Sequence, residues 1–381
     1  MHRHFQKIIT AFFLFSVVTL FILVPLFQRV AETARGDVHR THDGLLETHY
    51  ALELLTQGRN IYHEDVPKNI FPPPHDHIQV HVSKHGKVKM ENPALYHYVY
   101  PPLYFIQFAP LYELLQKLGT GFDLRWGLLL YLLGSIALLW RMPVEIETKI
   151  IGLFLLFINP WFLKFFLEGR NDIVVFFWLL LTFQLLQNQR WGLSIFSLGI
   201  ACLMKQTAWL FVPFVYLYLY HAWERTSDPG YWKDYAKRAL RLSIPVMVLA
   251  ALILIPFIFS DFQGLYEDLF AYPSGKSATS YPIHGYSLLA LLIRMDFPIS
   301  PFSFHQTGLL QLPAYLLVLL WAHISLKKHC TIAVLLFRAA FAISLFWFLS
   351  RFYHDNYLVF TASIFVLSWL FKKQASYAKH I

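Results

Sequence analysis

The sequence predicts an all-α protein that crosses a membrane several times, and three observations lead to this fold class. Of its 381 residues, 56% are hydrophobic and only 14% are charged. Apolar runs of about 20 residues, the length that spans a bilayer, recur along the chain. Short turns rich in lysine and arginine separate many of these runs. Because a soluble chain of this length could not bury so much apolar surface, we expect one membrane domain over 1–381.

About ten spans are expected, each some 20 residues long or slightly shorter. Their ranges are 8–27, 126–141, 149–165, 172–188, 191–204, 207–222, 241–260, 308–326, 331–349 and 356–371. If the N-terminus is cytoplasmic, the basic residues of every short loop fall on the cytoplasmic side, as the positive-inside rule requires. The basic start of the chain is also typical of a signal peptide, but the length of the apolar stretch favours an uncleaved first helix.

Two long loops, about 28–125 and 261–307, are predicted on the external side. The first is expected to carry an amphipathic helix, a small β-hairpin and a juxtamembrane helix, over 44–57, 77–82 with 87–90, and 103–118. If the last of these helices spanned the membrane, every later loop would change sides. The basic loops argue against that arrangement.

Acidic, basic and amide side chains gather on the predicted external side, where they form four clusters. These are His42-Asp43, Glu168-Gly169-Arg170-Asn171-Asp172, Lys205-Gln206 and Arg351-Phe352-Tyr353-His354-Asp355. A transport path would be expected to place ionisable groups deep in the bilayer instead. The pattern therefore indicates an enzyme that works at the boundary between lipid and water.

Asp43 has two interpretations from its position alone. It could cap the N-terminus of the amphipathic helix, a position that favours aspartate. It could also be a general base held near the membrane surface. Asp37 is a weaker candidate for that role. Arg338 falls in the middle of a predicted span, where an arginine is costly and marks either function or a buried partner; it could reach a lipid phosphate or pair with a carboxylate.

Four histidines of the predicted hairpin, at 75, 77, 81 and 85, share one parity and would share one face of a strand. Three of them could bind a metal ion. A solvated hairpin face is the simpler interpretation, because no fixed metal-ligand spacing is matched. We therefore predict no metal site and no required cofactor. Binding of a divalent metal ion is an alternative that no sequence pattern supports.

Six segments follow one another in an order that is known from a family. They are Asp43, Gly58 to Tyr62, Tyr98-Val99-Tyr100-Pro101-Pro102-Leu103, Asn159-Pro160 leading to 168–172, Lys205-Gln206-Thr207, and His354-Asp355-Asn356-Tyr357-Leu358. This order resembles the GT-C-type glycosyltransferases, membrane enzymes that use polyprenyl-phosphate sugars and include mannosyltransferases. The chain departs from the pattern in having glycine after Asp43, where an aromatic residue often follows, and in its longer first loop. The resemblance leaves the sugar and the acceptor open.

The resemblance implies a GT-C-like fold and the inverting transfer of a sugar, a hexose such as mannose, from a polyprenyl phosphate to a hydroxyl. The acceptor would be a lipid, glycan or protein in cell-envelope glycan synthesis. Asp43 would be the general base. The donor phosphate would be bound by Arg351 first, with Lys205, Arg170 and Arg338 as further candidates. The substrate contacts would be His42, Tyr100, Glu168, Asn171, Asp172, Gln206, His354 and Asp355.

Two other functions stay open at this point. A flippase for lipid-linked sugars would need polar residues through the bilayer centre and repeated halves, whereas Arg338 is the clear mid-span charge and no repeat is evident. A non-catalytic membrane scaffold would tolerate the loss of the polar clusters. The net charge of +9 comes largely from basic loops, so no nucleic acid partner is expected. Compact loops favour a bacterial plasma membrane, with membrane lipids around the chain and the site facing outward.

Overall fold

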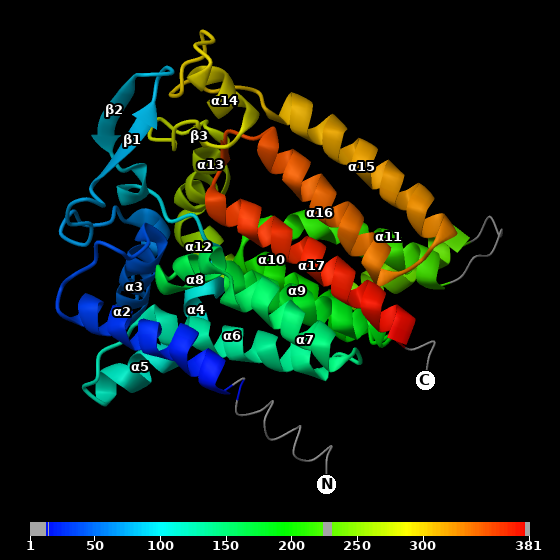
Figure 1. Ribbon diagram of the computed structural model, residues 1–381. Coiled ribbons are helices and arrows are strands. Elements are labelled where there is room, and N and C mark those ends of the chain that lie inside the picture. The colour runs from blue at the N-terminus through cyan, green and yellow to red at the C-terminus, as the bar shows by residue number, and fades with distance from the viewer. Residues whose placement is uncertain (1–12, 14, 224–230, 378–381) are drawn as a thin grey trace.

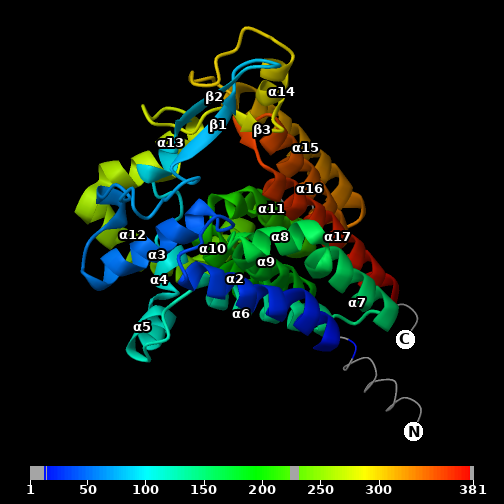
Figure 2. The same ribbon diagram turned by 60° about the vertical axis from the view of Figure 1, so that its left-hand side comes forward.

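The computed structural model describes residues 13, 15–223 and 231–377. Long helices run side by side as a bundle, and the strands gather with several short helices at one end of it (Figure 1). The same grouping is evident after rotation, with β1, β2 and α14 together at that end (Figure 2). We call this end, which carries β1 to β4, the strand end.

The bundle is built from the long helices of the chain, and each begins or ends near a polar turn. In order they are α2 (Val24–Ala34), α6 (Leu124–Arg141), α7 (Ile146–Leu153), α8 (Pro160–Leu167), α9 (Asp172–Gln187), α10 (Trp191–Met204), α11 (Val212–Trp223), α12 (Tyr231–Tyr266), α15 (Gly308–Lys328), α16 (Ile332–Phe348) and α17 (Asp355–Tyr377). Within it α9 packs against α6 and α10, and α16 packs between α15 and α17.

Five helices of the described residues are long and apolar enough to cross a membrane. They are Phe15–Ala34, Leu124–Arg141, Tyr231–Ser274, Gly308–Lys328 and Asp355–Tyr377. A sixth arises if Ile146–Ile158 and Pro160–Leu167, bent by 47°, count as one span. The chain is thus an all-α polytopic membrane protein. Helices also lie at the other predicted ranges, but they are shorter, so the count of ten spans stays a prediction.

The bend after Ile158 has a local cause. Asn159 has an extended backbone, and its Oδ1 accepts a hydrogen bond from the Phe162 N–H at 2.8 Å. Pro160 follows as the first residue of α8, a position that tolerates proline because its missing N–H has no partner there. The helix therefore stops and restarts, and the new segment leads straight to the polar turn at Glu168.

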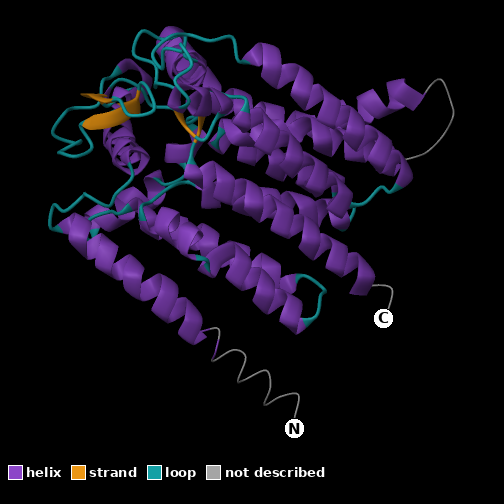
Figure 3. Ribbon diagram, turned by 45° about the horizontal axis from the view of Figure 1, so that its top comes forward, coloured by secondary structure: helices purple, strands orange, loops and turns teal. Residues whose placement is uncertain are grey.

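The strand end is made of the two long loops and the turn before α17. Its elements are α3 (Asp43–Thr56), β1 (His77–His81), β2 (Lys87–Glu91), α4 (Leu103–Ile106), α5 (Ala109–Lys117), α13 (Tyr272–Ser274), β3 (His284–Gly285), α14 (Leu288–Arg294) and β4 (Phe352–Tyr353). β1 pairs with β2 antiparallel, and β3 pairs with β4 in parallel (Figure 3). The second pairing, which joins the second long loop to the turn before α17, was not expected.

Two of the expected loop helices differ from their predictions. The amphipathic helix of 44–57 is present as α3, but it is buried on several sides, including at Glu47 and Thr48. The helix expected over 103–118 is divided into α4 and α5 near Phe108. Burial of α3 matters for function, because it brings the side chains of its first two turns into the interior of the strand end.

Candidate active site

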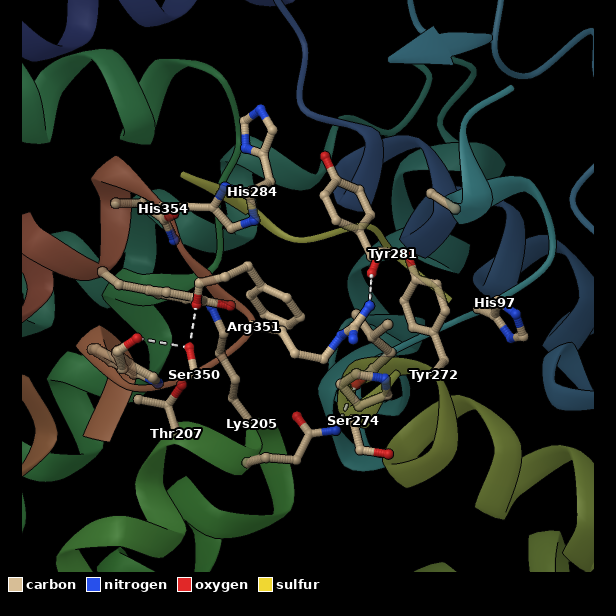
Figure 4. Close-up of a pocket in the computed structure, with 18 of the residues that line it drawn as sticks. His97, Lys205, Thr207, Tyr272, Ser274, Tyr281, His284, Ser350, Arg351 and His354 are labelled. Carbon is tan, nitrogen blue, oxygen red and sulfur yellow. Dashed lines mark hydrogen bonds between the residues drawn. The ribbon is translucent and has the colours of Figure 1, made fainter. Parts of the chain in front are cut away.

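A cavity of about 1300 Å³ lies at the strand end, where α3 meets the polar turns of the bundle. Figure 4 shows side chains from several distant segments pointing into it, among them Lys205, Tyr281, Arg351 and His354. Most of the predicted site residues line this cavity: His42, Asp43, Tyr100, Glu168, Arg170, Asn171, Lys205, Gln206, Arg351, His354 and Asp355. The fold therefore brings together clusters that are up to about three hundred residues apart in the chain.

Asp43 is the first residue of α3, and His42 occupies the cap position before it. The Asp43 Oδ1 lies 2.9 Å from His42 Nδ1 and 2.8 Å from the Gly44 nitrogen. When Nδ1 carries a proton, Asp43 accepts hydrogen bonds from both groups. Burial acts to raise the pKa of Asp43, but the His42 ring and the Gly44 N–H outweigh it and lower this pKa well below its usual value. The carboxylate therefore stays ionised at neutral pH.

The backbone fixes this residue against the next polar cluster. The His42 N–H donates a hydrogen bond to the Glu168 carbonyl at 2.7 Å, so the start of α3 is attached to the turn between α8 and α9. Tyr100 lies on the other side, and a Cβ at Gly44 would overlap its hydroxyl. Glycine at 44 thus lets the Tyr100 hydroxyl approach the first turn of α3, where an aromatic side chain would not fit.

Lys205 and Arg170 both have carboxylate partners. Lys205 Nζ donates to Asp172 Oδ1 at 2.7 Å and to Asn171 Oδ1 at 2.8 Å. Arg170 Nε donates to Glu168 Oε2 at 2.9 Å, and its Nη1 lies 3.5 Å from Asp355 Oδ1. The positive charge of each is largely neutralised within the protein. Asp172, expected to contact substrate, does not line the cavity and instead holds Lys205.

Arg351 differs from those two cations. It is 2% exposed, and it donates to the backbone carbonyls of Ser303 at 2.7 Å and Tyr281 at 3.2 Å. Its Nε has no hydrogen-bond partner, and no carboxylate of the described residues forms an ion pair with it. Burial lowers the pKa of Arg351, but a guanidinium starts high enough to stay charged at neutral pH. The cavity wall therefore contains a positive charge that no neighbouring carboxylate neutralises.

Arg338 does not line the cavity. Its guanidinium carbon lies 3.5 Å from the centre of the Trp321 ring, and its Nε donates to Ser325 Oγ at 3.1 Å. In the described part of the chain it has no carboxylate partner and it lies outside the cavity wall, although the sequence suggested a carboxylate or a lipid phosphate as its partner. The cation lies over an aromatic ring instead, which stabilises a charge removed from water.

Aromatic rings form one wall of the cavity. The rings of His284 and His354 lie 5.4 Å apart, and the Tyr281 ring is 5.7 Å from that of His354 (Figure 4). Burial, together with the nearby His284, Arg170 and His42, lowers the pKa of His354 to about 3, so this ring is neutral at physiological pH. Flat, uncharged ring faces of this kind suit the apolar faces of a sugar.

Sequence reasoning missed the pair of His97 and Asp268, and it missed the single residue Glu47. His97 Nδ1 lies 2.7 Å from Asp268 Oδ1, and both side chains are buried. His97 also stacks on Tyr272 at 4.3 Å, which fixes the second long loop against the segment of residues 97–100. Gln206 supports the same segment by donating to the Val99 carbonyl at 2.8 Å.

The other missed residue is Glu47, which lines the cavity one helical turn after Asp43. Glu47 follows Asp43 by four residues in a predicted helix, and this spacing could have indicated that the two side chains share one helix face.

The described residues contain no group of three or more His, Cys, Asp or Glu side chains arranged to hold a metal ion. In the hairpin, His75 Nε2 lies 2.7 Å from the Val38 carbonyl and His77 Nδ1 lies 2.9 Å from Asp76. The histidines that share one parity in the sequence thus contact different parts of the loop.

Comparison with known proteins identifies the class of the chain. Residues 98–227 match the model of glycosyltransferase family 87, a GT-C-type family of membrane glycosyltransferases. This range contains Tyr98 to Leu103, the turn at 168–172, and Lys205-Gln206, three of the segments on which the resemblance was based. No curated protein and no solved structure gave a significant match. With its apolar helices and this match, the chain is a membrane glycosyltransferase, and the family that its residues 98–227 match is of the GT-C type.

Proposed function

We propose that the protein transfers a hexose such as mannose from a polyprenyl phosphate to an acceptor hydroxyl, with inversion at the anomeric carbon. The observation that carries the proposal is that one cavity contains both an ionised, half-buried carboxylate and a buried cation that has no carboxylate partner among the described residues. Asp43 is the carboxylate and Arg351 is the cation. The first suits a hydroxyl that must lose a proton, and the second suits a phosphate that must gain negative charge.

The reaction is a single displacement. The acceptor oxygen forms a bond to the anomeric carbon while the bond from that carbon to the phosphate oxygen breaks. Asp43 takes the hydroxyl proton as general base. The polyprenyl phosphate leaves as an anion and needs no proton from a second carboxylic acid, in contrast to the leaving group of a glycosidase. Arg351 stabilises the charge that develops on the departing phosphate.

The apolar part of the cavity supports a lipid-linked donor. Beyond the polar clusters its wall includes Trp209 and Phe270, and it continues to Leu309 and Leu312 on α15. Those two leucines are largely exposed, as expected for a surface that faces lipid. These apolar side chains suit the isoprenoid chain of a donor whose phosphate lies near Arg351.

The distribution of charge supports an outward-facing site. α15 begins at the strand end and finishes at Lys327-Lys328, and α17 likewise ends near Lys372-Lys373. Basic residues of this kind mark the cytoplasmic side of short loops. The cavity lies at the other end of these helices, so we assign it to the external face of a bacterial plasma membrane.

The experiment is transfer of radiolabel from a panel of polyprenyl-phosphate sugars to membrane acceptors. Wild type is compared with Asp43→Asn, and Asp37→Asn is the matched control, because Asp37 is an exposed carboxylate of the same loop. We expect transfer by wild type and control, and loss of at least about a hundredfold in Asp43→Asn. Equal turnover in Asp43→Asn would reject the base. Absence of transfer by folded wild type from every donor would reject the proposed reaction and make lipid flipping the next assay.

A further inference from the structure

Glu47 is a buried carboxyl group without a partner. It is 3% exposed and lies in the wall of the cavity. Within the described residues it takes part in no hydrogen bond and no ion pair. Buried polar groups in proteins almost always have a hydrogen-bond partner. A carboxyl group that faces a cavity and lacks one is available to a ligand, and its burial is costly until a ligand supplies the missing bond.

The protonation of Glu47 is opposite to that of Asp43. Burial, and then the negative charges of Asp43 and Asp268, raise the pKa of Glu47 well above its usual value. Asp43 has the His42 and Gly44 contacts that keep it ionised, and Glu47 has no equivalent contacts. Of the two carboxyl groups in the first turns of α3, Asp43 is thus ionised, whereas its surroundings favour the neutral acid form of Glu47. The acid has a hydroxyl donor and a carbonyl acceptor.

The spacing of the two groups suits a particular kind of ligand. Side chains four residues apart on a helix share one face, with Cβ atoms about 5–6 Å apart. Adjacent hydroxyls on a sugar ring are separated by roughly one hydrogen-bond length. Two carboxyl groups at this spacing can therefore each contact one of two neighbouring hydroxyls from the same side of the ring.

We propose that Glu47 positions the acceptor and selects one that carries a second hydroxyl beside the hydroxyl that attacks. The acceptor is then a carbohydrate or another polyol, rather than a simple alcohol or a serine or threonine side chain. Asp43 takes the proton of the attacking hydroxyl, and the neutral Glu47 donates to and accepts from its neighbour. This inference rests on the proposed function, in which Asp43 is the base.

The test uses the full-length protein with the donor that supports wild-type transfer. The acceptor probes are octyl mannoside, octyl glucoside and their monodeoxy analogues, together with 1-octanol and a short serine peptide that have a single hydroxyl. The variants are Glu47→Leu and Glu47→Gln. Glu53→Leu is the matched control, because Glu53 is an exposed glutamate of the same helix.

We expect the wild type to use a glycoside and to transfer poorly to octanol and the peptide. Glu47→Leu should raise the glycoside KM by about 10- to 100-fold, the range for leaving a buried hydrogen-bonding group unpaired, with little change in kcat or in the donor KM. Glu47→Gln should stay within a few-fold of wild type, because an amide also donates and accepts. The wild type should bind an analogue that lacks the adjacent hydroxyl more weakly than the parent glycoside. Glu47→Leu should bind the analogue and the parent glycoside with equal affinity.

Several results would overturn the inference. An unchanged glycoside KM in Glu47→Leu would do so, as would equal use of octanol or the peptide by the wild type. Loss of kcat in Glu47→Gln would show that Glu47 works as an ionised group. If Glu47→Leu does not fold, the kinetics of Glu47→Gln and the wild-type affinity for the deoxy analogues still test the inference. Absence of transfer by wild type would remove the proposed function and this inference with it, whereas loss in Asp43→Asn with normal kinetics in Glu47→Leu would remove this inference alone.

Discussion

Arg351 and Lys205 line the same cavity, yet their removal should have opposite consequences. Arg351 has two backbone carbonyls as partners and no carboxylate, whereas Lys205 is bonded to Asp172. The informative pair of variants is therefore Arg351→Gln and Lys205→Gln. The first removes a charge that is free to act on a ligand, and the second removes a charge that already holds the protein together.

The structure gives a magnitude for each variant. Lys205→Gln leaves the Asp172 carboxylate, whose side chain is 17% exposed, without its cation. Removing one partner of a buried pair costs roughly 3–5 kcal/mol, and we take about 3 kcal/mol because both groups are partly solvated. Arg351→Gln loses two hydrogen bonds, each worth about 1 kcal/mol, and gains from no longer burying an unpaired charge. Its stability should stay within about 1 kcal/mol of wild type.

Activity should show the reverse order. Removing a donor that stabilises developing negative charge costs about 10²- to 10³-fold in kcat. Arg351→Gln should show that loss while it remains folded. Thermal unfolding in detergent and transfer rates at saturating acceptor provide the two measurements. Lys84→Gln, at an exposed lysine of the hairpin turn, is the control and should change neither quantity.

Two results would refute this reasoning. Transfer by Arg351→Gln at the wild-type rate would show that the unpaired cation does not assist the leaving group. A wild-type unfolding temperature for Lys205→Gln would show that its ion pair with Asp172 does not stabilise the fold. In that case the geometric distinction between the two cations would have no energetic meaning.

Three further variants test other parts of the site. His354 has a pKa near 3 when folded and 6.5 when free, so the unfolded chain binds the proton and stability falls as the pH drops from about 6.5 toward 3. In the wild type this costs roughly 2 kcal/mol of unfolding free energy at pH 5, and His354→Phe should abolish that cost. The unfolding temperature measured against pH tests this, and an unchanged pH profile would contradict it. Gly275 has φ +87°, and a Cβ there would overlap the Arg351 guanidinium. Gly275→Ala should therefore lose about 1–2 kcal/mol of stability and much of its transfer activity, and a silent variant would contradict the stated contact. Arg338→Leu should cost about 1 kcal/mol of stability through its lost ring contact but leave transfer unchanged, and a folded but inactive protein would return Arg338 to the site.

Much of the helical framework could be predicted from the sequence, because apolar runs and basic turns are local signals. Helices lie at 172–187 and 191–204, close to the ranges expected. The polar clusters were also visible, since each is a short run in the chain. Their meeting in one cavity required only that they share one end of the bundle.

What could not be predicted depends on contacts between distant segments. Glu47 lies in a segment predicted only as an amphipathic helix, whereas α4 and α6 pack against α3 and its side chain is 3% exposed. The pairing of His97 with Asp268 joins residues 171 positions apart. Arg338 was expected to need an anion, because the sequence does not reveal that Trp321 of the adjacent helix supplies a ring face. Such partners depend on which helices pack together, and local sequence patterns do not predict that packing.

The uncompensated guanidinium of Arg351 also has a consequence for handling the protein. A ligand that binds only the folded state stabilises it by about 2.7 kcal/mol when present at a hundred times its Kd. A phosphate-bearing lipid should reach this regime at a low concentration, because its affinity includes the neutralisation of a charge that is otherwise buried without a counter-ion. Preparations that retain such a lipid should therefore melt higher than thoroughly delipidated ones, and the melting temperature becomes a simple readout for finding the natural donor.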